Sequence, residues 1–574
     1  MPDSLPDLEA RRSQILLEIA QLGDFRRGSV HASFRRCGKP NCACARDDHP
    51  GHGPQVRLSY KRDGKTVQHT LSSPAQIHKA EREVATFRHF QRLSSELVEL
   101  NEQICQLRPP EAPDLEAAPY VPKKTLRAIQ DAVQAEVGSL LQVIVKARRR
   151  LGSFDLEALE EATRAALQRA GARLLEELLE ESGDASAAPL CACGAAMRCE
   201  GPRPKRLVSL LGSVSLQRLY YHCRHCWRGT VPFDRALDIE GTQYSPGVRR
   251  LLAVVGGETP FARGRELLAE LAGIAVSVKA VERQAEAIGS DLAARAESAR
   301  LQAALRGFPP QSGEPIPTFY FYIEIDGTGI PVTAAAAAGR EGKDGTAART
   351  REVKLGCVFT QTVLDAEGRP VRDQNSTTYT GAIEDAEAFG RRVYDEAWRR
   401  GLHRAERVVV LGDGATWIWN LCHIYFPNAI EIVDIYHARE HLWELGRQLF
   451  PQDRQQRRRW VRRRKKQLDE GRIEHLVRFL RSLRPEAPEV LEKLRTEAAY
   501  FEGHAQRMRY ADFRRQDLFV GSGVIEAGCR SVVAGRLKRS GMFWTVDGAN
   551  SIIALRCAQV SNRFADYWDE RAAA

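Results

Sequence analysis

Long hydrophobic runs are absent from this sequence of 574 residues. No apolar stretch approaches the roughly 18 residues that a membrane-spanning helix needs. Residues 1–17 alternate between acidic and basic side chains and contain no apolar segment of the kind that a signal peptide carries. Charged residues make up 28% of the chain, which also excludes a low-charge fibre. These absences predict a soluble cytoplasmic protein with no membrane partner.

The sequence also shows no secretion signal, which usually accompanies a disulfide framework. It nevertheless contains 13 cysteines. In such a chain, cysteines indicate metal sites or buried thiols. Eight of them fall into two tight clusters, and the remaining five are scattered. This distribution predicts metal centres.

The length of the chain exceeds what one hydrophobic core can organise, so three to five domains are expected. Lys and Arg outnumber Asp and Glu by 85 to 74, which gives a net charge of +11. An excess of this sign favours a polyanionic partner, most often nucleic acid. The alternative is that the charge serves solubility alone.

Residues 1–108 form a predicted N-terminal module with a helix at 8–22, a β-hairpin turned at Asp63-Gly64 and a long helix at 76–107. A loop before the hairpin carries three cysteines with histidines nearby, namely Cys37, Cys42, Cys44, His49 and His52. These are zinc-ligand types at an irregular spacing, so a structural zinc site and a reduced thiol cluster both fit the pattern. Residues 109–187 follow as a linker and a helical region broken at Gly152-Ser153.

Residues 188–240 predict a zinc ribbon, because two cysteine knuckles flank two strand-like runs at 206–210 and 213–221. The four expected ligands are Cys191, Cys193, Cys223 and Cys226. The first knuckle is one residue shorter than usual, and Cys199 is an alternative ligand there. Four thiolates leave no open position for water, so this zinc would be structural.

Residues 241–300 predict a helix-turn-helix region that binds DNA. A helix is expected from Ser245-Pro246, a second at 261–271, and a third that Ser277 caps and that ends at Gly289. Lys279 and Arg283 would face outward toward DNA. The alternative is a helical pair without that role, since many short helices share this pattern.

Carboxylates follow three short apolar runs that are typical of buried strands. Residues 320–325, 408–411 and 429–433 lead to Asp326, Asp413 and Asp434, and Glu526 stands much later at a predicted helix start. Carboxylates gathered at one sheet edge need positive charge, and a divalent metal usually supplies it. The element order of residues 318–450 is that of an RNase H-like sheet, and residues 516–574 complete this core with Glu526.

An all-α insertion is predicted at residues 451–515, and it opens with a helix whose charges are almost all positive. A phosphate backbone would relieve their mutual repulsion; a solvated helix face is the alternative. The candidate DNA contacts in this helix and near the C-terminus are Arg458, Arg462, Lys465, Lys538 and Arg539. The predicted fold class is therefore multidomain α+β: an RNase H-like α/β core with an all-α insertion, preceded by zinc-ribbon, helix-turn-helix and N-terminal cysteine-rich modules.

Three long motifs resemble bacterial insertion-sequence transposases of the ISKra4 family, which belong to the DDE group and are similar in layout to Mutator-like enzymes. They are Leu-Gly-Asp-Gly-Ala-Thr-Trp-Ile-Trp-Asn at 411–420, Asp-Ile-Tyr-His-Ala-Arg-Glu-His-Leu-Trp at 434–443 and Gly-Ser-Gly-Val-Ile-Glu-Ala-Gly-Cys at 521–529. The resemblance covers the chain from residue 188 onward. It implies that Asp326, Asp413 and Glu526 hold two Mg²⁺ ions, or Mn²⁺ in their place, for DNA cleavage and strand transfer.

The same resemblance matches Asp434 and His437 to a signature that follows the second catalytic aspartate. His437 would position the scissile phosphate or the nucleophile, and Asp434 would orient it or lie near the site. The alternative is an internal hydrogen-bonded pair that fixes the strand end.

Three functions fit these features. An active transposase, acting on terminal repeats as a dimer or higher oligomer, uses all three carboxylates. A domesticated DNA-binding protein without transposition activity would tolerate their loss. An RNase H-like nuclease or resolvase would share the site without needing the ribbon, the helix-turn-helix and the basic insertion.

Overall fold

The computed structural model describes residues 5–62, 65–107, 156–181, 189–306, 320–342 and 345–573, together with isolated positions between 127 and 145. The chain divides into two compact units, Met1–Pro122 and Lys123–Ala574. The predicted hairpin turn at Asp63-Gly64, the linker at 109–122 and the break at Gly152-Ser153 lie outside the described residues. Within the described helices, none is long and apolar enough to span a membrane.

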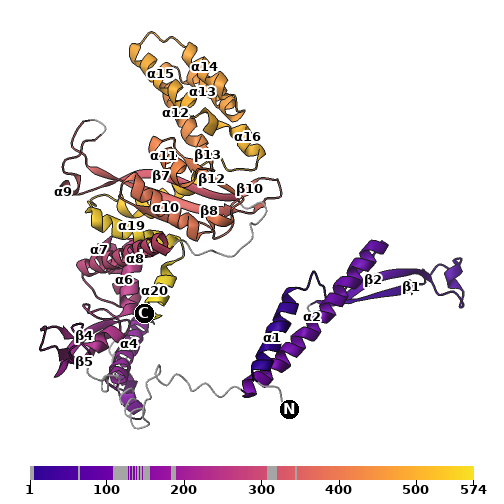
Figure 1. Cartoon of the computed structure of the whole chain (residues 1–574), viewed down its shortest axis with the longest axis horizontal. Helices are drawn as coiled ribbons and strands as arrows, with labels where there is room; N and C mark the ends of the chain where they lie inside the picture. Colours follow the sequence, from indigo (N-terminus) through magenta and orange to yellow (C-terminus); the bar gives the residue numbers. More distant parts are fainter. Residues whose placement is uncertain are drawn as a thin grey trace. The chain divides into compact units, whose positions relative to one another are not determined.

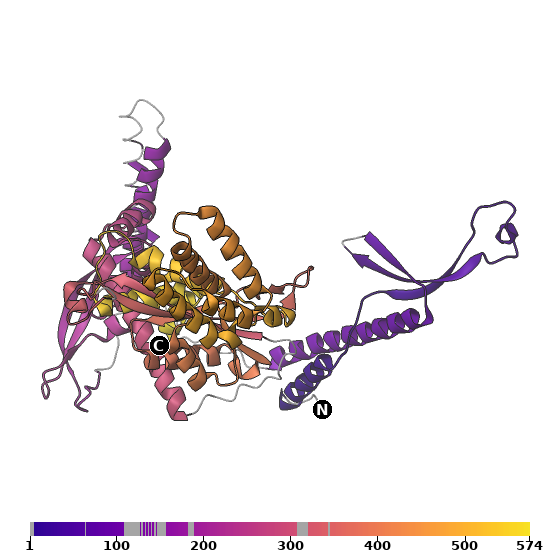
Figure 2. The same ribbon diagram turned by 90° about the horizontal axis from the view of Figure 1, so that it is seen from above.

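The first unit pairs two helices with a three-stranded antiparallel sheet of order β1-β2-β3. Its elements are α1 (Leu5–Ala20), β1 (Ser29–Arg35), β2 (His52–Arg62), β3 (Lys65–Leu71) and α2 (Pro74–Leu107). The two helices bury a small aliphatic core that includes Ile15, Leu93 and Ile104. Strands β2 and β3 form the predicted hairpin. Figure 2 shows that β1 and β2 extend from these helices as a ribbon that ends in a loop.

From residue 156 to residue 306, the described part of the second unit contains a helix, a small sheet and four further helices. They are α4 (Leu156–Glu181), β4 (Arg198–Ser209), β5 (Gly212–His222), β6 (Gly229–Thr230), α5 (Pro232–Ala236), α6 (Pro246–Glu258), α7 (Phe261–Ala272) and α8 (Val278–Arg306). Strands β4 and β5 pair in the antiparallel register expected of the ribbon. Helices α6, α7 and α8 share a core that contains Val248, Leu252, Leu268 and Val281.

The prediction that the third of these helices ends at Gly289 is wrong, because α8 continues to Arg306. Gly289 serves close packing instead. A Cβ at this position would lie 1.9 Å from the carbonyl oxygen of Ser551, so only glycine allows the backbones of α8 and α19 (Val546–Val560) to meet here. The predicted cap is present, since the Ser277 hydroxyl accepts a hydrogen bond from the backbone N–H of Ala280.

A five-stranded sheet of order β11-β8-β7-β12-β13 forms the centre of the second unit. The strands are β7 (Tyr320–Pro331), β8 (Thr350–Gln361), β11 (Thr378–Ala382), β12 (Arg407–Gly412) and β13 (Ile430–Val433). Strands β7, β8 and β11 pair antiparallel, whereas β12 runs parallel to both β7 and β13. The expected strand end at Asp326 is wrong, because β7 continues to Pro331 and pairs with β8 over its full length.

Helices cover both faces of this sheet. The remaining elements of residues 334–425 are α9 (Ala334–Ala337), β9 (Val363–Leu364), β10 (Pro370–Val371), α10 (Ala386–Arg399) and α11 (Thr416–Tyr425). Gly356 of β8 faces Val393 and Phe389 of α10, whereas the adjacent Leu355 lies against Gly528 on the opposite face. Because neighbouring residues of a strand point to opposite faces, the sheet is the middle of three layers.

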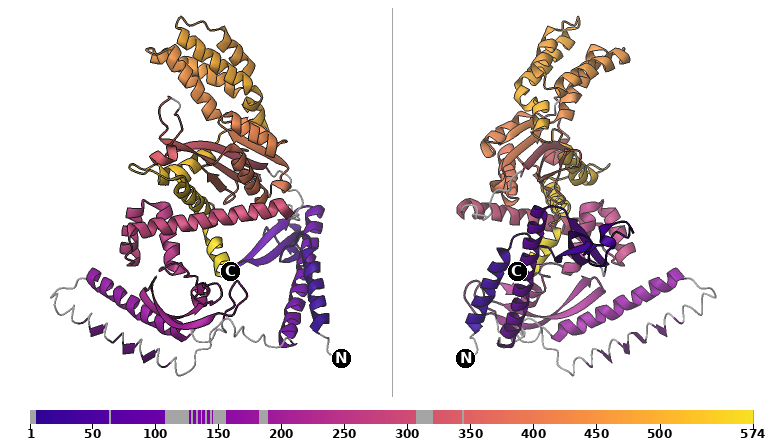
Figure 3. Two further views of the ribbon diagram at one scale, coloured as in Figure 1. Left: turned by 60° about the vertical axis from the view of Figure 1, so that its left-hand side comes forward. Right: turned by 90° about the vertical axis from the view of Figure 1, so that its right-hand side faces the viewer.

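Residues 451–515, predicted as an all-α insertion, contain α13 (Arg454–Asp469), α14 (Ile473–Ser482), α15 (Pro488–Gly503) and α16 (Tyr510–Arg515). Helix α12 (Ile435–Leu449) precedes them, within the range predicted for the first part of the core, and packs against α13 and α15. They extend from the β12–β13 side of the sheet, away from α8 and α19 (Figures 1 and 3). The chain then returns to the sheet with α17 (Gly523–Gly528), a π-helical turn (Cys529–Ala534), α18 (Gly535–Leu537), α19 and α20 (Phe564–Ala573).

Candidate functional site

Two aspartates lie side by side on the central strands of the sheet. Strands β7 and β12 run parallel, and Leu411 is the register partner of Glu324. Asp413 and Asp326 each follow this pair by two residues, so the parallel register brings them to the same level. Glu526 comes from α17, which packs against β7 and β8. Three carboxylates from distant parts of the sequence therefore converge at one edge of the sheet.

The electrostatics of these groups reflect their proximity. Burial raises the pKa of Asp326; the Cys529 thiol, which donates a hydrogen bond to it, opposes this shift, and the charge of Asp413 reinforces it. Burial also raises the pKa of Glu526, and the charges of Asp434 and Asp326 raise it further. The ligand oxygens of Asp326, Asp413 and Glu526 are not all within 4.8 Å of one another. Together they form an acidic group that is wider than the ligand set of one ion. A cation would stabilise this group.

Asp434 is buried, and its side chain is fully used by hydrogen bonds. One oxygen caps α12 by accepting from the backbone N–H groups of Tyr436 and His437. The other accepts from the backbone N–H of Ser522, at 2.5 Å, and from its hydroxyl. Asp434 therefore connects the start of α12 to the start of α17. Its bond to His437 involves the backbone and not the imidazole ring.

A chain of polar contacts runs from His437 into the insertion. The Nε2 atoms of His437 and His441 are 3.3 Å apart. The Nδ1–H of His441 donates to the Glu497 carboxylate of α15 at 2.7 Å, and Lys493 pairs with the other oxygen of Glu497 at 2.7 Å. Burial raises the pKa of Glu497, but the hydrogen bonds from His441 and Lys493 outweigh it and lower the pKa. Glu497 thus remains ionised and fixes the orientation of the His441 ring.

Further residues at the carboxylate edge were missed by the sequence analysis. The Cys529 thiol lies in the π-helical turn and donates to Asp326 at 3.3 Å. Glu324 is fully buried, and its carboxylate accepts from the backbone N–H of Ile525 at 2.8 Å. Burial raises the pKa of Glu324 to about 8. Tyr500 stacks on His441 and donates to the carbonyl oxygen of Asp413. Only Glu324 had a sequence signal, as a lone acid inside an apolar run.

The four cysteines predicted for the ribbon come together. Sulfur atoms of Cys191 and Cys226 are 3.3 Å apart, and those of Cys193 and Cys223 are 3.6 Å apart. These separations are close to the roughly 3.8 Å expected between sulfurs of a tetrahedral site with zinc–sulfur bonds of about 2.3 Å. Backbone N–H groups, mainly that of Cys226, lower the pKa of Cys223, which favours its thiolate. The backbone N–H of Arg228 opposes a rise in the pKa of Cys226, but the neighbouring sulfurs and burial outweigh it and raise this pKa. Cys199, the alternative ligand, is exposed on β4 and lies outside this cluster.

The N-terminal cysteines also form a compact cluster. Ligand atoms of Cys37, Cys42, Cys44 and His52 all lie within 4.8 Å of one another. Both clusters could hold a metal such as zinc. The second nearby histidine, His49, lies outside the cluster, and its Nδ1 accepts a hydrogen bond from the backbone N–H of Gly51.

The candidate DNA contacts occupy three places in the second unit. At the start of α8, Lys279 pairs with Glu282 and Arg283 is exposed. On α13, Arg458 and Arg462 are exposed, whereas Lys465 is half-buried. The last two lie after α18: Lys538 donates to the hydroxyl of Thr328, two residues beyond Asp326 on β7, and Arg539 is exposed. Lys538 is therefore the predicted DNA contact that the structure brings to the carboxylate edge.

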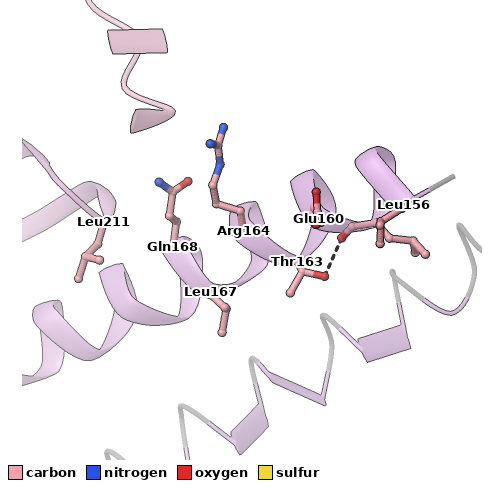
Figure 4. Close-up of a pocket in the computed structure, with 8 residues that line it drawn as sticks. Leu156, Glu160, Thr163, Arg164, Leu167, Gln168 and Leu211 are labelled. Atoms are coloured by element: carbon pink, nitrogen blue, oxygen red, sulfur yellow. Dashed lines mark hydrogen bonds between the residues drawn. The ribbon is translucent and has the colours of Figure 1, made fainter. Parts of the chain in front are cut away.

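An open groove of about 550 Å³ runs along α4 (Figure 4). Its lining is mainly aliphatic, with Leu156, Leu159, Leu167 and Leu211. Among its described lining residues there is one carboxylate and no cysteine or histidine, so these residues offer neither a metal-ligand set nor paired catalytic groups. The acidic edge of the sheet remains the candidate site for chemistry.

Two comparisons relate the chain to other proteins. Residues 5–77 match a family model described as "Domain of unknown function (DUF6788)". A protein from Streptococcus gallolyticus called "UPF0236 protein in vanSb 3'region" is 25% identical over 384 residues, which cover 63% of this chain and 74% of the relative. Since the first unit has 122 residues, most of the longer match lies in the second unit. Neither name describes a ligand or a reaction.

Proposed function

We propose that this chain is a DDE transposase that cleaves DNA and transfers strands at the ends of an insertion sequence. In this proposal the second unit contains an RNase H-like core, and Asp326, Asp413 and Glu526 are its catalytic carboxylates. Residue 188 onward would correspond to a transposase of the ISKra4 type, which the three long motifs resemble. The paired ends of such an element would be held by a dimer or a higher oligomer.

The main support for the proposal is that the parallel pairing of β7 and β12 brings Asp326 and Asp413 to the same level. Glu526 comes from a helix that packs against the same sheet. The strand order β11-β8-β7-β12-β13, antiparallel in its first three strands and parallel in its last two pairings, is the order expected of an RNase H-like sheet. A fold alone does not establish an activity. The acidic group supplies the chemical argument, because it concentrates negative charge where two cations would relieve it.

Two Mg²⁺ or Mn²⁺ ions at this edge would activate an attacking water or 3′-hydroxyl and stabilise the leaving oxygen. Asp326, Asp413 and Glu526 would hold these ions. His437, whose positive form would lower the pKa of Asp326, faces the same edge and positions the scissile phosphate. Asp434 acts indirectly by connecting α12 to α17.

Besides Lys538 at the carboxylate edge, surfaces outside this edge would bind DNA. Helix α13 of the insertion carries exposed arginines that repel one another. A phosphate backbone would offset this repulsion. The three-helix core around α8 supports a helix-turn-helix role for Lys279 and Arg283. The ribbon cysteines would hold a structural zinc ion.

The decisive experiment follows cleavage and joining of labelled DNA that carries the element's own ends, with Mg²⁺ or with EDTA. Wild type should nick and join this DNA only with metal, and Glu526→Gln and Asp326→Asn should bind DNA but not cleave it. Asp569→Asn is the matched control, because Asp569 is an exposed carboxylate of α20. Cleavage that survives Asp326→Asn would refute the assignment. Tight end-binding by wild type without any nicking would favour a domesticated DNA-binding protein.

A further inference from the structure

The loop at the end of the β1–β2 ribbon has a defined shape without a hydrophobic core. Residues 36–51 contain no large apolar side chain, and within this segment only Cys44 and Gly51 are buried. A segment of this length loses much conformational entropy when it is ordered, and apolar burial cannot offset that loss here. Small structural elements of this kind are usually held by a metal ion or by disulfide bonds.

Four potential ligands close this loop from both sides. Cys37 follows β1, Cys42 and Cys44 flank a short helical turn, and His52 begins β2. The sulfurs of Cys37 and Cys44 are 3.4 Å apart, and Cys42 Sγ lies 3.0 Å from His52 Nε2. The backbone N–H of Cys37 also points to the Cys44 sulfur at 3.4 Å. Three sulfurs and one imidazole nitrogen form a common tetrahedral zinc-ligand set.

Neither alternative to a metal explains this arrangement as well. A disulfide would use two of the three cysteines, leave the third thiol beside them and give His52 no role. A cluster of protonated thiols would supply only weak hydrogen bonds, because S–H is a weak donor. A metal ion would link the end of β1 directly to the start of β2.

The ribbon that this loop closes is strongly basic. Residues 26–62 contain nine Lys and Arg against two Asp. The side chains of Arg35, Lys39, Arg46 and Lys61 are exposed, and within the described residues the structure records no carboxylate partner for them. Next to this loop, residues 52–55 of β2 pair with β1 alone, because β3 joins β2 only from Val56 onward. A two-stranded β-ribbon is narrow enough to enter the major groove of DNA.

We propose that Cys37, Cys42, Cys44 and His52 bind one zinc ion, and that the β1–β2 ribbon closed by this ion contacts the phosphate backbone of DNA. The choice of DNA as the polyanion rests on the proposed transposase function; the zinc site does not. The ion would keep the two strands together at the end where no hydrophobic core does so.

The metal count of the full-length chain tests the first half of the proposal. Wild type purified with zinc should contain two ions, one in each cysteine cluster, and Cys42→Ser and His52→Ala should each contain one. Cys105→Ser is the matched control, because Cys105 is an exposed cysteine of α2 outside both clusters, and it should retain two ions. Cobalt in place of zinc should give the absorption of a three-sulfur site that disappears in the same variants. A single ion in wild type, or two ions in Cys42→Ser or His52→Ala, would overturn the site.

Salt-dependent binding of the full-length chain to a short DNA duplex of unrelated sequence tests the second half. Replacing Lys39, Arg46 and Lys61 by Gln should reduce the slope of log affinity against log salt by about two to three units, since each lost phosphate contact contributes about 0.9. The zinc-deficient Cys42→Ser should also bind more weakly. The control replaces three exposed arginines of α2, Arg82, Arg88 and Arg92, by Gln. An unchanged slope in the ribbon variant, or an equal reduction in the control, would overturn the DNA contact. Neither measurement depends on DNA cleavage. Failure of this proposal can therefore be distinguished from failure of the proposed function, which Asp326→Asn tests.

Discussion

The carboxylate of Asp434 accepts two hydrogen bonds from Ser522, which lies 88 residues later in the chain. One of the two is donated by the backbone N–H and the other by the hydroxyl. Asp434 begins α12, and Ser522 immediately precedes α17, the helix that carries Glu526. The contact therefore couples the two ends of the helical insertion at the point where the chain returns to the carboxylate edge.

Ser522→Ala should weaken this connection without removing the backbone bond. The buried Asp434 carboxylate would lose one hydrogen-bond donor, and the free energy of unfolding should fall by about 1–3 kcal/mol. DNA cleavage should fall as well, because Glu526 would be held less firmly. Urea denaturation and a cleavage assay measure the two effects. Ser482→Ala, which removes an exposed hydroxyl bonded to a helix carbonyl, should change neither quantity appreciably. Full cleavage in a destabilised Ser522→Ala would separate this contact from function.

Glu497→Gln tests whether the insertion positions His437. Gln keeps the size of the side chain but removes the charge that holds His441 and Lys493, which should cost about 1.5–3 kcal/mol of stability. If His441 orients His437, the cleavage rate at saturating DNA should fall while DNA affinity is retained. Glu502→Gln on the same helix α15 is the control, since its partner Arg481 is exposed. An unchanged cleavage rate in Glu497→Gln would show that the contacts between the two histidines serve only stability.

The same carboxylate predicts a dependence of stability on pH. Hydrogen bonds from His441 and Lys493 lower the pKa of Glu497 below its ordinary value of 4.5, despite burial. A group with a lowered pKa in the folded state stabilises the protein above its unfolded pKa, and this contribution is lost as the pH falls through the folded pKa. The stability advantage of wild type over Glu497→Gln should therefore be present above about pH 4.5 and shrink as the pH falls below it. Denaturation curves across this range provide the measurement, and a difference that grew on acidification would contradict the sign.

The strands and carboxylates could be predicted from sequence because their signals are local. Runs of apolar residues before Asp326, Asp413 and Asp434 mark β7, β12 and β13, and cysteine spacing marks the ribbon ligands. Contacts between distant segments have no such signal. No sequence pattern around His441 indicates that Glu497, 56 residues later, accepts a hydrogen bond from it. The strand end expected at Asp326 was misplaced because pairing with β8 continues through Gly327.

The role of Gly289 also depends on a contact between distant segments. A glycine inside a helical pattern often marks the end of the helix, yet Gly289 lies within α8, where this helix meets α19. The participation of Cys529 at Asp326 depends likewise on a π-helical turn that no local pattern indicated. His52 and His49 are equivalent by spacing, and only the fold brings His52 to the cysteines.

Removing the charges of Arg458 and Arg462 should weaken DNA binding without affecting the fold. Both side chains are exposed on α13, and the described part of the chain shows no ion pair for either. The double variant Arg458→Gln, Arg462→Gln should reduce the salt slope of DNA binding by about two units and leave the unfolding midpoint unchanged. Arg495→Gln, an exposed position on α15 paired with Glu492, should leave the slope as in wild type. Equal slopes for all three proteins would assign the α13 charges to solubility.

Gly289→Ala should disrupt the contact between α8 and α19. Its Cβ would lie 1.9 Å from the carbonyl oxygen of Ser551, and a backbone atom cannot move aside as a flexible side chain can. We expect a loss of at least about 1–3 kcal/mol in the free energy of unfolding. Gly503→Ala at the end of α15 meets nothing within 4 Å and should be neutral or slightly stabilising, because alanine favours helix. Equal free energies of unfolding for the two variants would mean that α8 and α19 can move apart without loss of stability. That result would contradict the importance of the close approach at Gly289.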